Sequence, residues 1–417
     1  MLDLTIGSMV KRPLIALFPE AYVNMENRSF FFTSRTSHAV NDIYWFILPA
    51  VLPLILEQFG LDYGPAGGLL TAFLGMIAFF SMVFGKLSDR YPRWLIIGLG
   101  FVLTAGGMVA AGLSPTFPIF FVLILITGVG VSTYHPTMYA AFDESTVDRR
   151  GKNYGSFEFW GATGIFIMFI AYGRLLQVLD WRGLFFISAI PAVIMAYVFL
   201  RIRGSSTSEK YTRTIANDKL QDSERTPLLV SILFFLGVTV RILCITAVVN
   251  FIPTYLVRDV GLPPWTASYG SGFIFLGGML FVPLAGILAD RWTPLPVLHV
   301  LAAATGPVIF LVGTLQTFWS IGLMLILFGG CWLGVMPSQN MMLSSLHKSV
   351  RKGQAFGILI GLMTVTNALG PGLFGVLADK IGLGASIQVF SLPAVLGWVF
   401  FLLMSRNAFM RTSELYS

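Results

Sequence analysis

Residues 94–113 read WLIIGLGFVLTAGGMVAAGL, twenty consecutive positions without a charged side chain. An α-helix rises about 1.5 Å per residue, so this segment would extend for about 30 Å, the thickness of the hydrocarbon core of a bilayer. The segment is continuously apolar and does not alternate every second residue, which favours a helix over a barrel strand. Because lipid offers the backbone no hydrogen-bond partners, this segment predicts a helix that crosses a membrane.

The rest of the chain repeats this pattern. Of its 417 residues, 56% are hydrophobic and only 11% are charged, whereas soluble domains carry about 25% charged residues. The charges gather in short runs between apolar segments. We therefore predict an all-α membrane protein with twelve transmembrane helices, at residues 36–59, 65–85, 94–113, 116–141, 154–178, 182–200, 228–256, 266–289, 295–315, 317–342, 354–378 and 384–405.

The distribution of Lys and Arg predicts the orientation of the chain. If the N-terminus lies inside, the cytoplasmic segments hold 22 of the 27 Lys and Arg, the outer loops hold four, and Arg241 lies within a span. Basic residues mark cytoplasmic loops, so both termini are expected in the cytoplasm, with the protein in the cytoplasmic (inner or plasma) membrane. The same bias explains the net charge of +7. Because no soluble basic domain exists, no nucleic-acid partner is expected.

One long polar segment divides the spans six and six. Residues 203–226 are rich in Ser, Thr, Lys and Glu and indicate a flexible cytoplasmic linker. The predicted organisation is an N-terminal cytoplasmic tail (1–35), an N-terminal six-helix bundle (36–202), the linker, a C-terminal six-helix bundle (227–405) and a C-terminal tail (406–417). Within the first tail, residues 9–23 fit either a helix on the membrane surface or a disordered tail. Cys244 and Cys331, the only cysteines, are expected to be small apolar fillers, so neither a disulfide nor a metal site is predicted.

A short motif occurs in two loops. Gly85-Lys-Leu-Ser-Asp89-Arg90 follows the second span, Gly286-Ile-Leu-Ala-Asp290-Arg291 follows the eighth, and a weaker echo, Gly375-Val-Leu-Ala-Asp379-Lys380, follows the eleventh. The first two are one six-helix unit apart, as duplicated halves predict. The repeated motif resembles the signature between helices 2 and 3 of major facilitator transporters. The resemblance implies two pseudo-symmetric six-helix halves, and it assigns the switching between inward-open and outward-open states to Gly85, Asp89, Arg90, Gly286, Asp290 and Arg291.

Three further segments are similar to the fosmidomycin-resistance branch of that superfamily. They are Ser37-His38-Ala-Val-Asn41-Asp42 in the first span, Ser88-Asp89-Arg90-Tyr91-Pro92 after the second, and Tyr134-His135-Pro136 in the fourth. Two positions depart from the branch, which often has Glu where Thr137 stands and tends to have Gln where Glu158 stands. Substrate and coupling therefore need not be those of drug export.

Ionisable residues inside a span are costly and indicate function or pairing. His38, Asn41, Asp42 and Trp45 are spaced i, i+3, i+4 and i+7, so they share one helix face. That face fits either a polar stripe that lines the central cavity, with His38 or Asp42 taking a proton, or a set of bonds that joins this helix to a neighbour.

Three other spans carry candidates. A packed, hydrogen-bonded histidine is favoured over a proton carrier for His135. Glu158 lies between aromatic residues and is favoured as a proton carrier over a partner for Arg149 or Lys152. Arg241 is shaped to grip a carboxylate or phosphonate, and the alternative is an ion pair with Asp42 or Glu158. Asn250, a weaker candidate for the substrate site, fits helix-to-helix bonding as well.

These residues favour secondary active transport of a small organic solute by alternating access, in the form of proton-coupled export (antiport). Proton-coupled uptake of an organic anion (symport) is the alternative, and a non-transporting membrane sensor or assembly partner is a third class. No phosphate-binding loop occurs and no catalytic constellation is evident, so neither ATP use nor an enzyme is expected. The predicted partners are the substrate, protons and the lipid bilayer. No cofactor is expected beyond the proton gradient, and a monomer is predicted.

Overall fold

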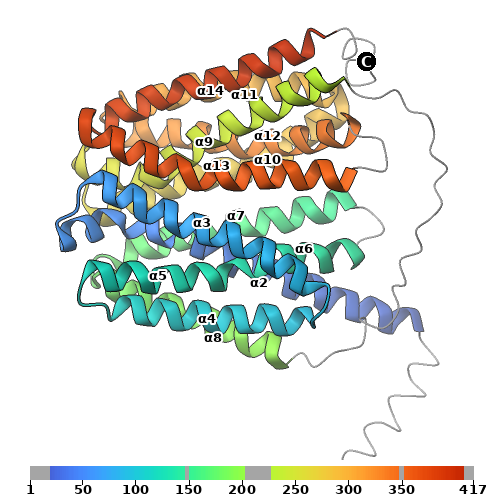
Figure 1. Cartoon of the computed structure of the whole chain (residues 1–417), viewed down its shortest axis with the longest axis horizontal. Coiled ribbons are helices and arrows are strands. Elements are labelled where there is room, and N and C mark those ends of the chain that lie inside the picture. Colours follow the sequence, from blue (N-terminus) through green and yellow to red (C-terminus); the bar gives the residue numbers. More distant parts are fainter. Residues whose placement is uncertain (1–18, 146–149, 202–226, 347–351, 408–417) are drawn as a thin grey trace, which may run out of the picture.

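The computed structural model describes residues 19–145, 150–201, 227–346 and 352–407, with side chains placed for residues 30–142, 155–201, 227–343 and 364–407. Within these ranges every regular element is a helix (Figure 1). The predicted linker and the ends of both tails lie outside the described residues. The helices are α2 (Pro19–Phe59), α3 (Tyr63–Ser88), α4 (Arg93–Gly112), α5 (Phe117–Ser132), α6 (Tyr134–Ser145), α7 (Arg150–Leu175), α8 (Trp181–Arg201), α9 (Leu228–Arg258), α10 (Pro264–Trp292), α11 (Pro294–Val312), α12 (Phe318–Leu346), α13 (Lys352–Ile381) and α14 (Leu383–Ser405).

Eleven helical segments of the described residues are long and apolar enough to cross a membrane. One of them, Phe117–Phe142, combines α5 and α6. The remaining expected span, residues 354–378, falls within the 30-residue helix α13, of which residues 352–363 have no described side chains. The chain is thus an all-helical multi-pass membrane protein. Its orientation in the membrane stays a prediction.

The helices form two groups in space. In Figure 1, α2–α8 occupy the lower part of the bundle and α9–α14 the upper part, and α3 and α7 of the N-terminal group pack against α13 and α10 of the C-terminal group. We call the end that carries Pro19 and Ser405 the terminal end, and the end that carries Phe59 and Leu383 the distal end. If the basic residues mark the cytoplasm, the distal end faces outside.

The contacts described between the groups lie towards the distal end. A Cβ atom at Gly67 would clash with the carbonyl oxygen of Pro371, so the backbones of α3 and α13 touch there. Ser268 on α10 donates a hydrogen bond to the carbonyl oxygen of Phe169 on α7 at 2.8 Å. Close packing of small residues is what holds helices together in lipid, where burial of apolar surface gives little driving force.

Helix α2 begins earlier than the sequence analysis predicted. The first span was expected at residue 36 with a tail before it, whereas the helix starts at Pro19. Proline is well tolerated in the first turn of a helix because its missing N–H has no partner there anyway. Residues 20–35 contain neither glycine nor proline, so nothing in the sequence ends the helix before the membrane.

The fourth expected span is interrupted at Thr133, between α5 and α6. Pro136 has no N–H to donate to the carbonyl oxygen of Ser132, four residues earlier, and its ring crowds that carbonyl. The hydroxyl of Ser81 on α3 donates to the Ser132 oxygen instead, at 3.3 Å. A neighbouring helix therefore satisfies the freed carbonyl, as a proline inside a membrane requires. The break places His135 at the start of α6.

Candidate proton and substrate site

His38 of α2 is completely buried, and α7 fixes its ring. The ring stacks on that of Phe157 with centroids 3.9 Å apart. Its Nδ1 lies 2.8 Å from the carbonyl oxygen of Phe157. A carbonyl oxygen can only accept, so Nδ1 must carry a hydrogen. The remaining nitrogen, Nε2, points to the other side of the ring.

Asp42 lies between two histidines. Its Oδ2 is 3.2 Å from Nε2 of His38, and its Oδ1 is 3.3 Å from Nε2 of His135 on α6. Asn41, also buried, places its Nδ2 at 3.2 Å from Nδ1 of His135. The ring of Trp45 meets that of His135 edge to face at 5.6 Å. The structure therefore brings together all four residues of the predicted stripe with His135, and contacts to two neighbouring helices, α6 and α7, are present.

Glu158 of α7 is exposed, and the hydroxyl of Tyr139 donates to its Oε1 at 2.5 Å. Tyr139 also lies against His135, with ring centroids 5.6 Å apart. The expected alternative partners of Glu158, Arg149 and Lys152, have side chains outside the described residues.

Arg241, in the middle of α9, is buried and reaches across to α12. Its Nη2 donates to the carbonyl oxygens of Cys331 at 2.7 Å and Trp332 at 3.3 Å. The expected ion pair with Asp42 is absent from the described contacts, because both oxygens of Asp42 face histidines of the N-terminal group. These carbonyl groups satisfy Nη2 without neutralising the charge of the guanidinium, while Nε is buried without a hydrogen-bond partner among the described residues.

Asn250 lies two turns further along α9 and is also buried. Its Nδ2 donates to the carbonyl oxygen of Thr246 at 2.8 Å, one turn back on the same helix. The hydroxyl of Thr246 donates to Asn367 on α13. The helix-to-helix bond in this region therefore comes from Thr246 and Asn367, while Oδ1 of Asn250 is buried without a hydrogen-bond partner.

Comparison with known proteins identifies the fold and the family. Residues 36–358 match the family described as the Major Facilitator Superfamily. The chain belongs to this superfamily of transporters. Its fold matches a bacterial homologue of the human lysosomal transporter Spinster, in an inward-facing and occupied conformation, with a TM-score of 0.75 at 16% identity over 93% of this chain and 99% of that one.

Relatives in the superfamily carry different substrates. The chain is 21% identical to the 4-hydroxybenzoate transporter PcaK of Acinetobacter baylyi over 63% of this chain, a match that spans 65% of the relative's length. It is 23% identical to the proton-coupled antiporter flippase LtaA of Staphylococcus saprophyticus over 72% of this chain and 74% of the relative. It is 25% identical to the Fosmidomycin resistance protein of Escherichia coli over 31% of this chain and 32% of the relative. The resemblance drawn from the motifs is thus supported.

The residues that the superfamily resemblance assigned to gating lie at the terminal end. Asp89, Arg90, Asp290 and Arg291 are all exposed there, just beyond or within the last turns of α3 and α10. Gly85 and Gly286 lie one turn before them in the same helices and are partly buried. Their role in switching stays a proposal.

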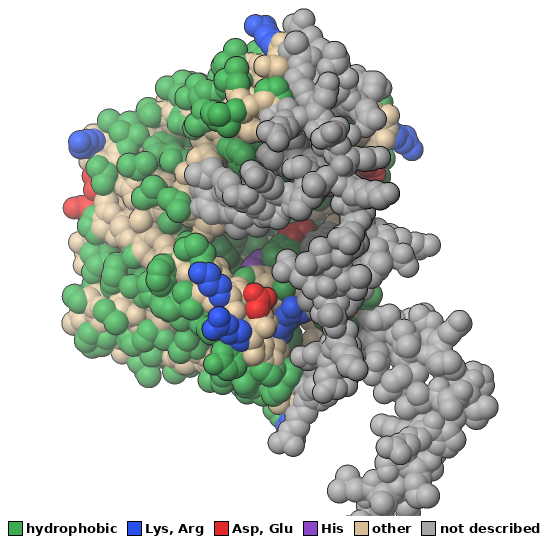
Figure 2. Space-filling model, turned by 45° about the vertical axis from the view of Figure 1, so that its right-hand side comes forward, with side chains coloured by type: hydrophobic (Ala, Val, Ile, Leu, Met, Phe, Trp, Pro, Cys, Tyr) green, Lys and Arg blue, Asp and Glu red, His purple; other side chains and the backbone are tan. Residues whose placement is uncertain are grey.

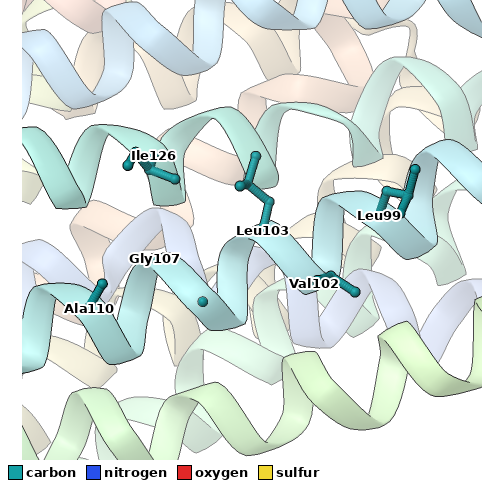
Figure 3. A pocket seen from close by; sticks show the side chains of 7 residues that line it. Leu99, Val102, Leu103, Gly107, Ala110 and Ile126 are labelled. Atoms are coloured by element: carbon teal, nitrogen blue, oxygen red, sulfur yellow. The ribbon is translucent and has the colours of Figure 1, made fainter.

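One cavity of the described residues lies away from the polar site. It is an apolar groove of about 600 Å³ along α4, where Leu99, Val102 and Ala110 line it and Ile126 of α5 closes one side (Figure 3). Leu99 and Val102 are about half exposed. A groove of this composition on the outside of a membrane bundle fits lipid tails, and it is not a site for a polar solute.

His38, Asp42 and His135 could also be considered as metal ligands, since one ligand atom from each lies within 4.8 Å of the others. As Asn41 is oriented, its amide donates to Nδ1 of His135. A neutral ring then carries its hydrogen on Nε2, the atom that faces Asp42 and that a metal would need. The orientation thus suits a proton better than a metal ion.

The sequence analysis missed two residues of this site. Gly161 of α7 leaves the room that the site occupies, because a Cβ atom there would clash with Oδ2 of Asp42 and lie 2.9 Å from Cε1 of His38. Phe157 contributes its ring and its carbonyl oxygen. A backbone carbonyl has no signature in a sequence. The spacing of Phe157 and Gly161, one turn apart beside Glu158, was the only available signal.

Proposed function

We propose that this protein is a secondary active transporter that exports a small organic solute in exchange for protons, with the proton held by His38, Asp42 and His135. The proposal rests on the number of hydrogen atoms available between Asp42 and the ring of His38. Nδ1 of His38 already carries one, so a neutral ring would leave the lone pair of Nε2 only 3.2 Å from a carboxylate oxygen. Two acceptors would then lie side by side with little access to water, which is unfavourable.

One additional proton removes this conflict. Whether it sits on Nε2 of His38 or on Oδ2 of Asp42, the pair contains one hydrogen more than a neutral imidazole and a carboxylate together. Nε2 of His135, with its own hydrogen, lies 3.3 Å from the other oxygen of Asp42. The close approach of these atoms supports a proton-loaded site, and loss of the proton would leave a net negative charge.

The site is open to one side. The side chains of His135 and Asp42 are 24% and 16% exposed, while His38 is fully covered. Glu158 and Tyr139 extend the polar path from His135 to exposed surface. Figure 2 shows the molecule with its terminal end brought forward, and a histidine side chain is visible there deep below the surface. With the groups joined at the distal end, this arrangement fits an inward-facing state of an alternating-access cycle.

Proteoliposomes with a pH-sensitive dye inside test the proposal. Asp42→Asn should abolish substrate-driven proton movement, whereas Glu57→Gln, which neutralises an exposed carboxylate on the same helix, should leave it unchanged. The sign of the pH change separates export from uptake. Substrate movement without proton movement in the wild-type protein would contradict the proposal.

Uptake of an organic anion with protons is the second candidate, and Arg241 favours it. Its described partners are carbonyl oxygens, so its positive charge remains available to an anion in the middle of the membrane. Relatives named as 4-hydroxybenzoate transporters support the same direction. Arg241→Met should then abolish binding of 4-hydroxybenzoate while leaving the melting temperature within a few degrees. Retained binding would leave export as the better proposal.

A further inference from the structure

The third copy of the loop motif, Gly375 to Lys380, lies at the distal end, away from the other two. Its Asp379, near the end of α13, accepts two hydrogen bonds from the backbone of α3. Oδ1 accepts from the N–H of Tyr63 at 2.7 Å and Oδ2 from the N–H of Gly64 at 2.8 Å. Both oxygens of one carboxylate in the C-terminal group thus hold the first turn of a helix in the N-terminal group.

The first N–H groups of a helix have no partners within the helix and carry partial positive charge, so a carboxylate there is stabilising. Helix α3 has a suitable capping residue of its own in Asp62, at the N-cap position. Asp62 nevertheless makes no side-chain capping bond. In this structure, the capping of α3 is left to the opposite group of helices.

We propose that Asp379 and Asp62 alternate as caps of α3, so that Asp379 latches the distal end shut and Asp62 replaces it when the two groups separate. The exchange keeps the N–H group of Gly64, the N2 position that an N-cap side chain reaches, satisfied in both states, so opening does not leave that donor without a partner. The inference rests on the alternating-access part of the proposed function. It does not depend on the nature of the substrate or of the coupling ion.

Glycines make the latch possible. A Cβ atom at Gly64 would lie 2.6 Å from Oδ2 of Asp379, so alanine there would push the carboxylate away. A Cβ atom at Gly375 would clash with the carbonyl oxygen of Tyr63. The carboxylate of Asp379 reaches the start of α3 because Gly64 and Gly375 place no side chain where α3 and α13 cross.

The chain offers a matched control. Asp259, at the end of α9, accepts from the N–H of Gly384 at the start of α14, at 2.8 Å. The chemistry is that of Asp379, but both helices belong to the C-terminal group. Its loss removes a helix cap without removing a bond between the groups.

Pulsed electron–electron resonance on the full chain in lipid nanodiscs tests the proposal. Spin labels at Val178 and Trp319, two exposed distal positions in the N-terminal and C-terminal groups, report whether the distal end is closed. Asp379→Asn and Gly64→Ala should each raise the ratio of open to closed molecules by about five-fold. Asp62→Ala should lower it, because only the open state needs that cap. Asp259→Asn should leave it unchanged.

The opposite signs for Asp379 and Asp62 separate the latch from a general loss of stability, which would act in one direction. The proposal is overturned if Asp379→Asn and Gly64→Ala leave the distances unchanged, or if Asp62→Ala opens the distal end. If Asp379→Asn does not fold, the results for Gly64→Ala and Asp62→Ala still decide. The measurement needs no substrate and no proton gradient, so its result stands apart from that of the proteoliposome assay.

Discussion

Phe157 fixes both the plane and the hydrogen of His38. Its ring stacks on the imidazole at 3.9 Å, and its carbonyl oxygen accepts from Nδ1 at 2.8 Å. One residue of α7 thus determines which nitrogen of a histidine on α2 faces Asp42. A ring held in this way cannot rotate to avoid the carboxylate, and this constraint underlies our proposal of a proton between them.

His38→Gln should reduce substrate-driven proton movement at least about ten-fold, because an amide can keep the bond to the Phe157 carbonyl but cannot take up a second proton. Dye-loaded proteoliposomes measure the effect. His299→Gln is the control, since His299 is a partly buried histidine of α11 in the C-terminal group. An equal loss in both variants would show that the effect is not specific to the site.

Gly161→Ala should disturb the same site from α7. The added methyl group would meet Oδ2 of Asp42, so the carboxylate must move away from His38. We expect a several-fold loss of proton movement, with a melting temperature that falls only modestly. Gly155→Ala on the same helix is the control, because a Cβ atom there meets no atom within 4 Å. Normal proton movement in Gly161→Ala would contradict the assigned position of the proton.

Glu158→Gln should slow proton exchange without abolishing coupling. The glutamine oxygen can still accept from Tyr139, but the exposed negative charge that attracts protons to the path is lost. The rate of dye response after a pH jump should fall a few-fold, while the number of protons moved per substrate stays constant. If the number of protons moved per substrate fell in Glu158→Gln, the proton carrier would be Glu158 and not Asp42.

Gly107→Ala should destabilise the N-terminal group. A Cβ atom at Gly107 on α4 would lie 2.5 Å from Oγ1 and 2.8 Å from the backbone nitrogen of Thr127 on α5, so the helices must separate. Overpacking of this kind costs about 1–3 kcal/mol, which should appear as a lower melting temperature. The neighbouring Gly106 faces open space, so Gly106→Ala should leave the melting temperature unchanged or raise it slightly.

The sequence was sufficient to predict what depends on composition and periodicity. The continuous apolar segments predicted the helices, and the spacing of His38, Asn41, Asp42 and Trp45 predicted one polar face, which the structure contains. Bonds to backbone atoms could not be predicted, because every residue carries the same amide. For that reason the alternative to an anionic substrate at Arg241 was an ion pair with Asp42 or Glu158, whereas the described partners are carbonyl oxygens of α12. The bonds from α3 to Asp379 were not foreseen for the same reason.

The interruption at Thr133 has a mechanical consequence. An unbroken helix would be rigid, and any displacement of His135 would be transmitted to the region where α5 packs against the glycines of α4. Because the helix is broken at Thr133, α6 is a short separate helix with its own axis, and it carries His135 and Tyr139. The break allows α6 to tilt while α5 keeps its contacts with α4. The helix that carries part of the site and the helix that anchors the bundle thus share one stretch of chain without sharing one axis.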